Sequence, residues 1–205
     1  MLAPVLQPSL HAAVLNQLGC APGTANRQQL ERLLAAYIRS VPWESALRIV
    51  KRAHTQNWQD CARWPDEFWQ GNLQHGAGGT CFESNFAFSA LLRGLGYEGY
   101  LTINDMGESI GCHTAIIVFL AGQKFLVDVG YPVYTLLPLQ YQPVSEHDSP
   151  FFRYTVRELG SDRYQIERRP HPIPYAFTLV DQPVNEDDYR QATINDYGPD
   201  GHFLQ

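Results

Sequence analysis

The sequence has little positive charge for its length. Its 205 residues contain 15 Lys and Arg against 21 Asp and Glu, which gives a formal net charge of −6. A nucleic-acid-binding protein needs clustered Lys and Arg side chains to neutralise phosphates. The basic pair Arg168-Arg169 is too short for that purpose and is expected to lie at a solvated strand end. We therefore expect no nucleic-acid partner.

Long apolar segments are also missing. The longest unbroken apolar run extends from Ala115 to Ala121, whereas a helix needs about 20 apolar residues to cross a bilayer. Near the N-terminus the first basic residue is Arg27, and Pro4 and Pro8 interrupt the apolar residues before it. This is not the pattern of an export signal. We expect a cytoplasmic protein with no membrane partner.

The four cysteines have no metal-binding or disulfide spacing. In a protein without an export signal they are expected to be reduced thiols, with Cys20 and Cys61 inert and Cys112 in the core. No Cys-x-x-Cys or His-Glu-x-x-His element is present, so no metal site is expected. The glycines at 76, 78 and 79 lack the Lys-Ser/Thr of a phosphate-binding loop.

Hydrophobic spacing indicates helices first and strands later. Helices are predicted at about 9–18, 26–40 and 81–93, the second with a capping arrangement of Asn26 and Gln29. The polar, Trp-rich segment 48–73 is expected to be a loop with short elements. Strands are predicted at 99–104, 113–120, 124–129, 151–158, 163–168 and 175–180, with a hairpin at Ala121-Gly122-Gln123.

This order predicts an α+β fold, with an N-terminal helical lobe followed by a mostly antiparallel β sheet or small barrel. We place the boundary between the lobes after residue 97. Residues 1–97 then form the helical lobe that carries Cys81, and residues 98–205 form the β lobe that carries His113 and Asp128.

Cys81 is the first candidate for chemistry. It follows Gly78-Gly79-Thr80 at the start of a predicted helix. The glycines are expected to let the backbone turn sharply, and a helix N-terminus favours negative charge on the sulfur. A thiolate is therefore expected to be more populated than at the ordinary cysteine pKa of ~8.5. Taken alone, the pattern is a weak signal and favours a buried structural cysteine.

His113 and Asp128 form the second candidate. His113 begins one predicted strand, and Asp128 lies in an otherwise apolar part of the next. With a turn centred near Gly122, residues whose numbers sum to about 243 lie opposite each other, which makes His113 and Asp128 cross-strand neighbours or nearly so. A buried carboxylate that orients an imidazole provides the base that a thiol nucleophile needs. A purely structural buried pair is the alternative.

These segments resemble motifs of the arylamine N-acetyltransferases, a family whose fold is related to transglutaminases and papain-like thiol enzymes. Residues 41–44 are similar to the family's Ile-Pro-Phe-Glu, and residues 78–85 to its Gly-Gly-x-Cys-Phe-Glu-x-Asn. His113 and residues 127–130 match its catalytic His and Asp motifs. Residues 175–179, followed by Asp188 and Asn195, resemble a later Tyr-x-Phe stretch with an acidic residue and Asn.

The resemblance implies a cysteine-protease-like or transglutaminase-like core with Cys81, His113 and Asp128 as the catalytic residues. It implies a ping-pong acyltransferase in which Cys81 takes an acetyl group from acetyl-CoA and passes it to an arylamine, hydrazine or similar small amine. Acetyl-CoA would be a co-substrate, with no permanently bound cofactor. Backbone N–H groups at the start of the Cys81 helix would stabilise the oxyanion.

The chain departs from the family pattern at three places. Ala77 replaces an Arg that usually pairs with the Glu of Ile-Pro-Phe-Glu, so Glu44 is expected to lack its usual partner, and Ser45 replaces an Asn. The sequence ends at Gln205, about where family members enter a C-terminal domain that helps to shape the acceptor pocket and the coenzyme A cleft. We expect a shortened member, in which a homodimer would cover the surface that a missing domain exposes.

Two other functions stay open at this stage. The same three residues would serve an amide-forming acyltransferase with a different thioester donor, or a hydrolase in which water accepts the acyl group. A catalytically silent binding module is the third hypothesis, and it predicts an unreactive Cys81.

Overall fold

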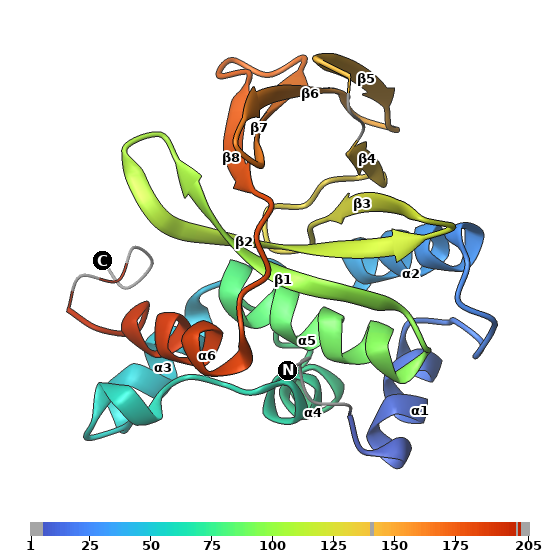
Figure 1. The fold of residues 1–205 in the computed structure, drawn as a ribbon. Helices are drawn as coiled ribbons and strands as arrows, with labels where there is room; N and C mark the ends of the chain where they lie inside the picture. Colours follow the sequence, from blue (N-terminus) through green and yellow to red (C-terminus); the bar gives the residue numbers. More distant parts are fainter. Residues whose placement is uncertain (1–5, 140–141, 200, 202–205) are drawn as a thin grey trace.

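The computed structural model describes residues 6–139, 142–199 and 201 (Figure 1). Five of its helices precede the strands and one follows them. They are α1 (Pro8–Gln17), α2 (Arg27–Ser40), α3 (Ala46–His54), α4 (Pro65–His75), α5 (Cys81–Gly94) and α6 (Glu186–Asn195), with a 3₁₀ turn at Trp58–Asp60.

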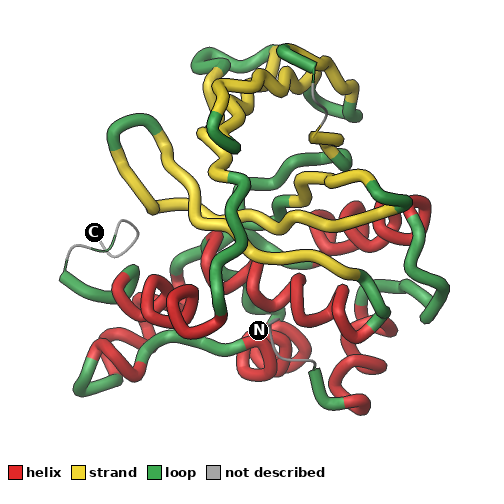
Figure 2. Tube along the Cα trace, viewed as in Figure 1, coloured by secondary structure: helices red, strands yellow, loops and turns green. Residues whose placement is uncertain are grey.

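All strands of the described chain join one antiparallel sheet. The strands are β1 (Glu98–Met106), β2 (Ser109–Leu120), β3 (Gln123–Val127), β4 (Leu137–Leu139), β5 (Val144–Asp148), β6 (Arg153–Gly160), β7 (Arg163–Arg169) and β8 (Tyr175–Val180). Their order is β4-β3-β2-β1-β8-β7-β6-β5, and β4 also contacts β6. The sheet therefore curls into a nearly closed ring above the helices (Figure 2), and the predicted α+β class is confirmed.

Helix α5 lies at the centre of the helical layer. Every residue from Cys81 to Leu92 is buried, because the helix packs against α4 on one side and against β1 and β2 on the other. The helix is thus buried around its whole circumference, with polar side chains such as Glu83 and Asn85 among the apolar ones. A second apolar core fills the ring of strands and includes Ile117, Leu126, Ile166 and Phe177. The nucleophile candidate thus lies at the end of the most deeply buried helix.

The hairpin between β2 and β3 has the predicted register. Phe119 pairs with Lys124 and Ile116 with Val127. Ala121 and Gly122 both have positive φ, 51° and 77°, as a two-residue hairpin turn that matches the strand twist requires. Strand β3 ends at Val127 rather than at Val129, so Asp128 directly follows the strand.

The prediction of a loop over residues 48–73 is wrong. Helix α3 occupies its first part and α4 its last part. Pro65 at the first turn, two acidic residues after it and Gly76 in the left-handed region give α4 the usual start and stop signals. The sequence interpretation also missed β4, β5 and α6, whereas the cap of α2 is confirmed, since the Asn26 side chain accepts from the Gln29 amide.

Helix α6 returns the chain from the sheet to the helical layer. It lies beside the other helices in Figure 1, and the Tyr189 ring packs against the rings of Phe82 and Phe86. The Tyr189 hydroxyl donates to the Phe82 carbonyl, at 2.8 Å. In the part of the chain that the structure describes, no helix is both long and apolar enough to cross a membrane.

Candidate active site

The loop before Cys81 needs both of its glycines for close packing. A Cβ on Gly78 would lie 1.6 Å from the Pro42 carbonyl oxygen, and one on Gly79 would lie 2.9 Å from the Phe68 ring. Neither glycine is among the residues with positive φ. The expected sharp turn is therefore not the reason for the two glycines. They allow residues 42–44 to lie directly against the loop, where Trp43 and Gly79 form a parallel bridge.

Arg63 holds one side of this loop. Its guanidinium forms a buried ion pair with Glu83 and donates to the Gly78 carbonyl at 2.7 Å. Glu83 also accepts from the Tyr197 hydroxyl and from the Arg63 backbone amide. Removal of one partner would leave an uncompensated buried charge, at a cost of about 3–5 kcal/mol. The bond from Arg63 to the Gly78 carbonyl connects the loop to this pair.

Arg48 holds the other side. It is fully buried, pairs with Asp196 at 2.6 Å and donates to the Thr80 hydroxyl. Its guanidinium lies 4.3 Å from the centroid of the Tyr197 ring. The segment after α6 is thus tied to the residue directly before Cys81.

Glu44 has partners other than the arginine of the family pattern. Its carboxylate accepts from the backbone amides of Gly78, at 3.2 Å, and Leu47, at 2.9 Å. Glu44 thus lacks the arginine partner of the family pattern, as expected with Ala77, but it still contacts this loop. With Ala77 in place of the arginine, Glu44 holds the loop through backbone N–H groups.

His113 and Asp128 are in direct contact. His113 Nε2 lies 2.7 Å from Asp128 Oδ2, and both side chains are buried. The second carboxylate oxygen accepts from the Asn85 amide at 3.0 Å and from the backbone amides of Gly130 and Tyr131. These donors compensate the burial of the negative charge. Since Nε2 faces the carboxylate, Nδ1 becomes the basic nitrogen of the ring.

Cys81 lies against the same end of strand β2. Its thiol contacts the carbonyl of Cys112 at 3.7 Å, and its own carbonyl accepts from the Thr114 hydroxyl at 3.0 Å. These two residues flank His113. A Cβ on Gly130 would lie 2.3 Å from Cys81 Cα, so glycine is needed there for the Asp128 loop to reach the nucleophile. The structure therefore brings Cys81, His113 and Asp128 to one place.

The ionisation of Cys81 differs from the expectation. Burial raises the pKa of its thiol, and the negative charges of Asp196 and Asp128 raise it further, whereas Arg48 lowers it. A protonated thiol needs a base when it attacks, and Nδ1 of His113 is the group available on the adjacent strand for that role.

The start of α5 also offers hydrogen-bond donors. The first N–H groups of a helix have no partner within the helix. Among the described residues no side chain caps α5, because the Thr80 hydroxyl interacts with Arg48 instead. These amides lie at the N-terminal end of α5, where Cys81 stands, and are suited to stabilise a developing oxyanion.

The charge of Asp196 should be measurable in the reactivity of Cys81. A nearby carboxylate disfavours a thiolate, so Asp196→Asn is expected to lower the pKa of the Cys81 thiol and to shift its iodoacetamide alkylation profile to lower pH. The asparagine can still accept from Arg48. Peptide mass spectrometry would follow each cysteine separately, with Cys20, whose pKa is raised by burial without any effect of Asp196, as the internal reference. An unchanged Cys81 profile would contradict this assignment of charge.

Several residues of the site were not predicted from sequence. Arg48 and Arg63 contact the loop before Cys81, and Tyr197 donates to Glu83 on the Cys81 helix. Asn85, on that helix, donates to Asp128, and Asp196 pairs with Arg48. Asn85 was visible only as part of a motif. Arg48 and Arg63 lie in the segment that was expected to be a loop. Without a predicted helix, the sequence did not indicate that their side chains are directed toward the Cys81 loop.

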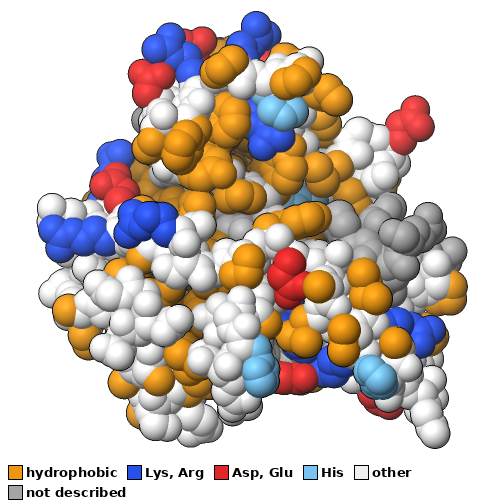
Figure 3. Space-filling model, turned by 180° about the vertical axis from the view of Figure 1, so that it is seen from behind, with side chains coloured by type: hydrophobic (Ala, Val, Ile, Leu, Met, Phe, Trp, Pro, Cys, Tyr) orange, Lys and Arg blue, Asp and Glu red, His pale blue; other side chains and the backbone are white. Residues whose placement is uncertain are grey.

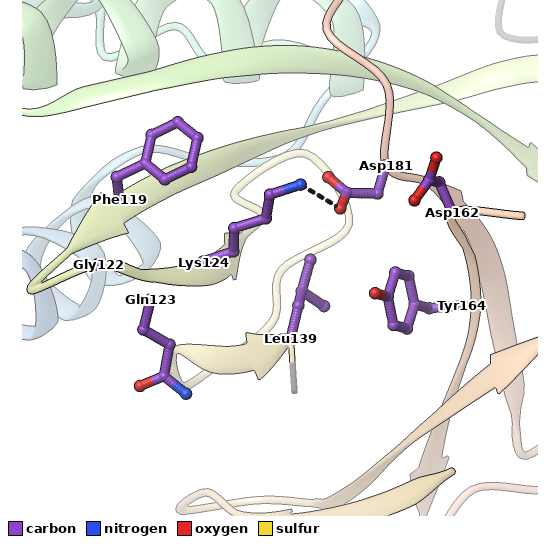
Figure 4. A pocket seen from close by; sticks show the side chains of 8 residues that line it. All are labelled: Phe119, Gly122, Gln123, Lys124, Leu139, Asp162, Tyr164 and Asp181. Atoms are coloured by element: carbon purple, nitrogen blue, oxygen red, sulfur yellow. Dashed lines mark hydrogen bonds and ion pairs between the residues drawn. The ribbon is translucent and has the colours of Figure 1, made fainter. Parts of the chain in front are cut away.

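A cavity of about 380 Å³ at the other end of the hairpin is a separate feature (Figure 4). Lys124 and Asp181 project into it and pair with each other at 2.7 Å, and Tyr100 also donates to Asp181. Phe119, which lines the cavity, lies six residues along β2 from His113, which corresponds to about 20 Å. Because of its distance from Cys81, this cavity is not part of the candidate site. Within the described residues, no group of three or more His, Cys, Asp or Glu side chains could hold a metal ion.

Solved structures with the same fold are arylamine N-acetyltransferases. The enzyme from Salmonella typhimurium superposes with a TM-score of 0.80 at 19% identity, covering 98% of this chain and 74% of that one. An arylamine N-acetyltransferase from Bacillus cereus, described as having a Cys-His-Glu catalytic triad, gives 0.76 at 18% identity, covering 97% and 80%. The class of fold is therefore that of these thiol-containing transferases.

A family model described as N-acetyltransferase matches residues 27–205, and the chain belongs to this family. The resemblance to arylamine N-acetyltransferases in the motifs is thereby confirmed, and the protein is an acyltransferase enzyme. A curated relative, proansamycin X synthase from Amycolatopsis mediterranei (strain S699), is 28% identical over an alignment of 192 residues that covers 88% of this chain and 71% of the relative.

Proposed function

We propose that the protein transfers an acetyl group from acetyl-CoA to the amino group of an arylamine or hydrazine, with Cys81 as nucleophile, His113 as general base and Asp128 as the residue that orients His113. The observation that carries the proposal is the 2.7 Å contact between His113 and Asp128 beside the buried thiol at the start of α5. Family membership supports acetyl transfer as the reaction.

In the first half-reaction, Nδ1 of His113 takes the thiol proton while the sulfur attacks the thioester carbonyl. The carbon–sulfur bond to CoA breaks, and the CoA sulfur leaves with the proton from His113. In the second half-reaction, the amine attacks the acetyl-cysteine, and His113 removes a proton from the nitrogen. The Cys81 sulfur then leaves and takes this proton from His113, which restores the thiol. Amides at the start of α5 stabilise the oxyanion in both steps.

A second candidate uses the same residues with a different thioester donor. It is supported by the relative at 28% identity, which is named as a synthase of proansamycin X rather than as an acetyltransferase. A hydrolase, with water as the acceptor, is the corresponding variant of the reaction. A small amine and an acyl-CoA as substrates belong to the proposal, and a homodimer and a cytoplasmic location stay predictions from the sequence.

Intact-protein mass spectrometry tests the proposal directly. We expect purified protein mixed with acetyl-CoA, without any amine, to gain one acetyl group and to lose it when an arylamine is added. Release of free CoA without amine and without a lasting adduct would favour the hydrolase. If no adduct and no free CoA appear while Cys81 still reacts with iodoacetamide, acetyl-CoA is not the donor and the second candidate replaces the first.

A further inference from the structure

Arg168 is a cation of the β lobe that the proposed reaction does not use. It lies on β7 on the same face as the buried residues Tyr164 and Ile166, so its side chain is directed toward the inside of the ring of strands. It is half-buried, whereas its neighbour Arg169 is exposed. The expectation of two solvated arginines at a strand end is therefore wrong for Arg168.

Aromatic rings surround the Arg168 guanidinium. It lies 4.4 Å from the centroid of the Tyr131 ring and 5.4 Å from that of Phe152. Nη2 donates to the Tyr131 hydroxyl and to Nε2 of His171, at 3.2 Å. His171 accepts through Nε2 because its other nitrogen, Nδ1, can donate to the Ile173 carbonyl at 2.6 Å.

The charge of Arg168 is not neutralised within the described residues. Every other cation that lies over an aromatic ring there has a carboxylate partner, namely Arg27 with Glu31, Arg48 with Asp196, Arg63 with Glu83, Lys124 with Asp181 and Arg190 with Glu186. Arg168 forms no ion pair in this part of the chain, and its buried Nε has no hydrogen-bond partner there. A partly desolvated guanidinium without a counter-charge is suited to bind an anion.

Tyr131 connects this guanidinium to the candidate active site. Its ring meets the His113 ring edge to face, with 6.0 Å between the centroids, and its backbone amide donates to Asp128 at 3.0 Å. Arg168 and His113 are therefore separated by about one aromatic ring. Figure 3 shows the molecule from behind. Its upper part presents mostly hydrophobic side chains, with basic, acidic and histidine side chains among them.

We propose that Arg168 is the centre of an anion-binding site that takes a carboxylate or phosphate oxygen of a substrate. An aromatic amine that carries an acid group has both features: an anionic oxygen for Arg168 and an amine for the reaction at Cys81. The phosphate groups of a CoA donor also carry anionic oxygens that a guanidinium can bind. The binding experiment below distinguishes the carboxylate of an acceptor from the phosphates of CoA. The inference rests on the proposed function, because that function supplies the amine and the CoA thioester.

Equilibrium binding, measured by calorimetry with one ligand at a time, tests this site without any turnover. We expect Arg168→Gln to weaken the binding of 4-aminobenzoate by about 10- to 100-fold, as expected for the loss of a hydrogen bond to a charged group. The neutral methyl ester of the same compound should bind equally to both proteins. Arg169→Gln is the matched control, since that neighbouring side chain is exposed, and it should change neither affinity.

The other outcomes of the binding experiment either assign the anion site to the CoA donor or overturn the inference. A similar loss for CoA, with 4-aminobenzoate unaffected, keeps the anion site and assigns it to the donor. Equal affinities of wild type and Arg168→Gln for both anions, or no binding of either anion to the wild type, overturn the inference. Arg168→Lys keeps the charge and should restore part of the affinity if the first variant is poorly folded. Acetylation of Cys81 by acetyl-CoA tests the proposed function separately.

Discussion

Cys81→Ala is expected to form no acetyl adduct with acetyl-CoA and to lower kcat by about five to six orders of magnitude, the loss typical of removing a catalytic nucleophile. Without the sulfur no thioester can form, and the remaining groups only bind the substrates and polarise the carbonyl. Intact mass and CoA release, measured on the same samples, would show both effects.

Cys112→Ala is the matched control for this variant. Cys112 is a second buried cysteine, and its contact with the Cys81 thiol is made by its backbone carbonyl, which alanine retains. We expect the adduct to form on Cys112→Ala as on the wild type. If the adduct persisted on Cys81→Ala and disappeared on Cys112→Ala, the nucleophile would be Cys112 and the proposed mechanism would be wrong.

The contact between His113 and Asp128 was predictable because its determinants are local. Gly122 fixes the turn of the hairpin, the turn fixes the register of β2 against β3, and the register carries the two residues to the same end. The start of α5 was predictable for a similar reason, since the apolar spacing and the glycines around it are contiguous in sequence. Such features depend on a few neighbouring residues.

The support of the Cys81 loop was not predictable in the same way. The pair of Arg48 and Asp196 joins residues 148 positions apart, and no local pattern identifies which carboxylate a buried arginine will meet. Helix α6 begins with three acidic residues and has few apolar ones, so hydrophobic spacing could not indicate it. Its position is set by Tyr189, which fills a place between α5 and the sheet.

The ionisation of Cys81 shows the same limit. The position at a helix N-terminus is visible in sequence and favours a thiolate. The burial of the thiol and its proximity to Asp196 and Asp128 act in the opposite direction, and both follow from tertiary packing alone. General-base assistance by His113 is therefore more important here than the sequence pattern indicates.

Asp128→Asn is expected to lower kcat by about four orders of magnitude while leaving the fold in place. The asparagine oxygen can still accept from Asn85 and from the amides of Gly130 and Tyr131, as Asp128 Oδ1 does. Its NH₂ group would then face Nε2 of His113, which must turn from donor to acceptor. The imidazole proton moves to Nδ1, and the nitrogen that should take the thiol proton is no longer basic.

This effect on the first half-reaction can be measured by single-turnover acetylation. The rate of CoA release is compared between the wild type and Asp128→Asn. Asp181→Asn is the matched control, because Asp181 is also a buried carboxylate but pairs with Lys124 at the far end of the hairpin. Loss of stability alone would affect both variants, whereas the wrong tautomer affects only Asp128→Asn. A rate for Asp128→Asn within tenfold of the wild type would exclude an orienting role for Asp128 and reduce its contact with His113 to a structural one.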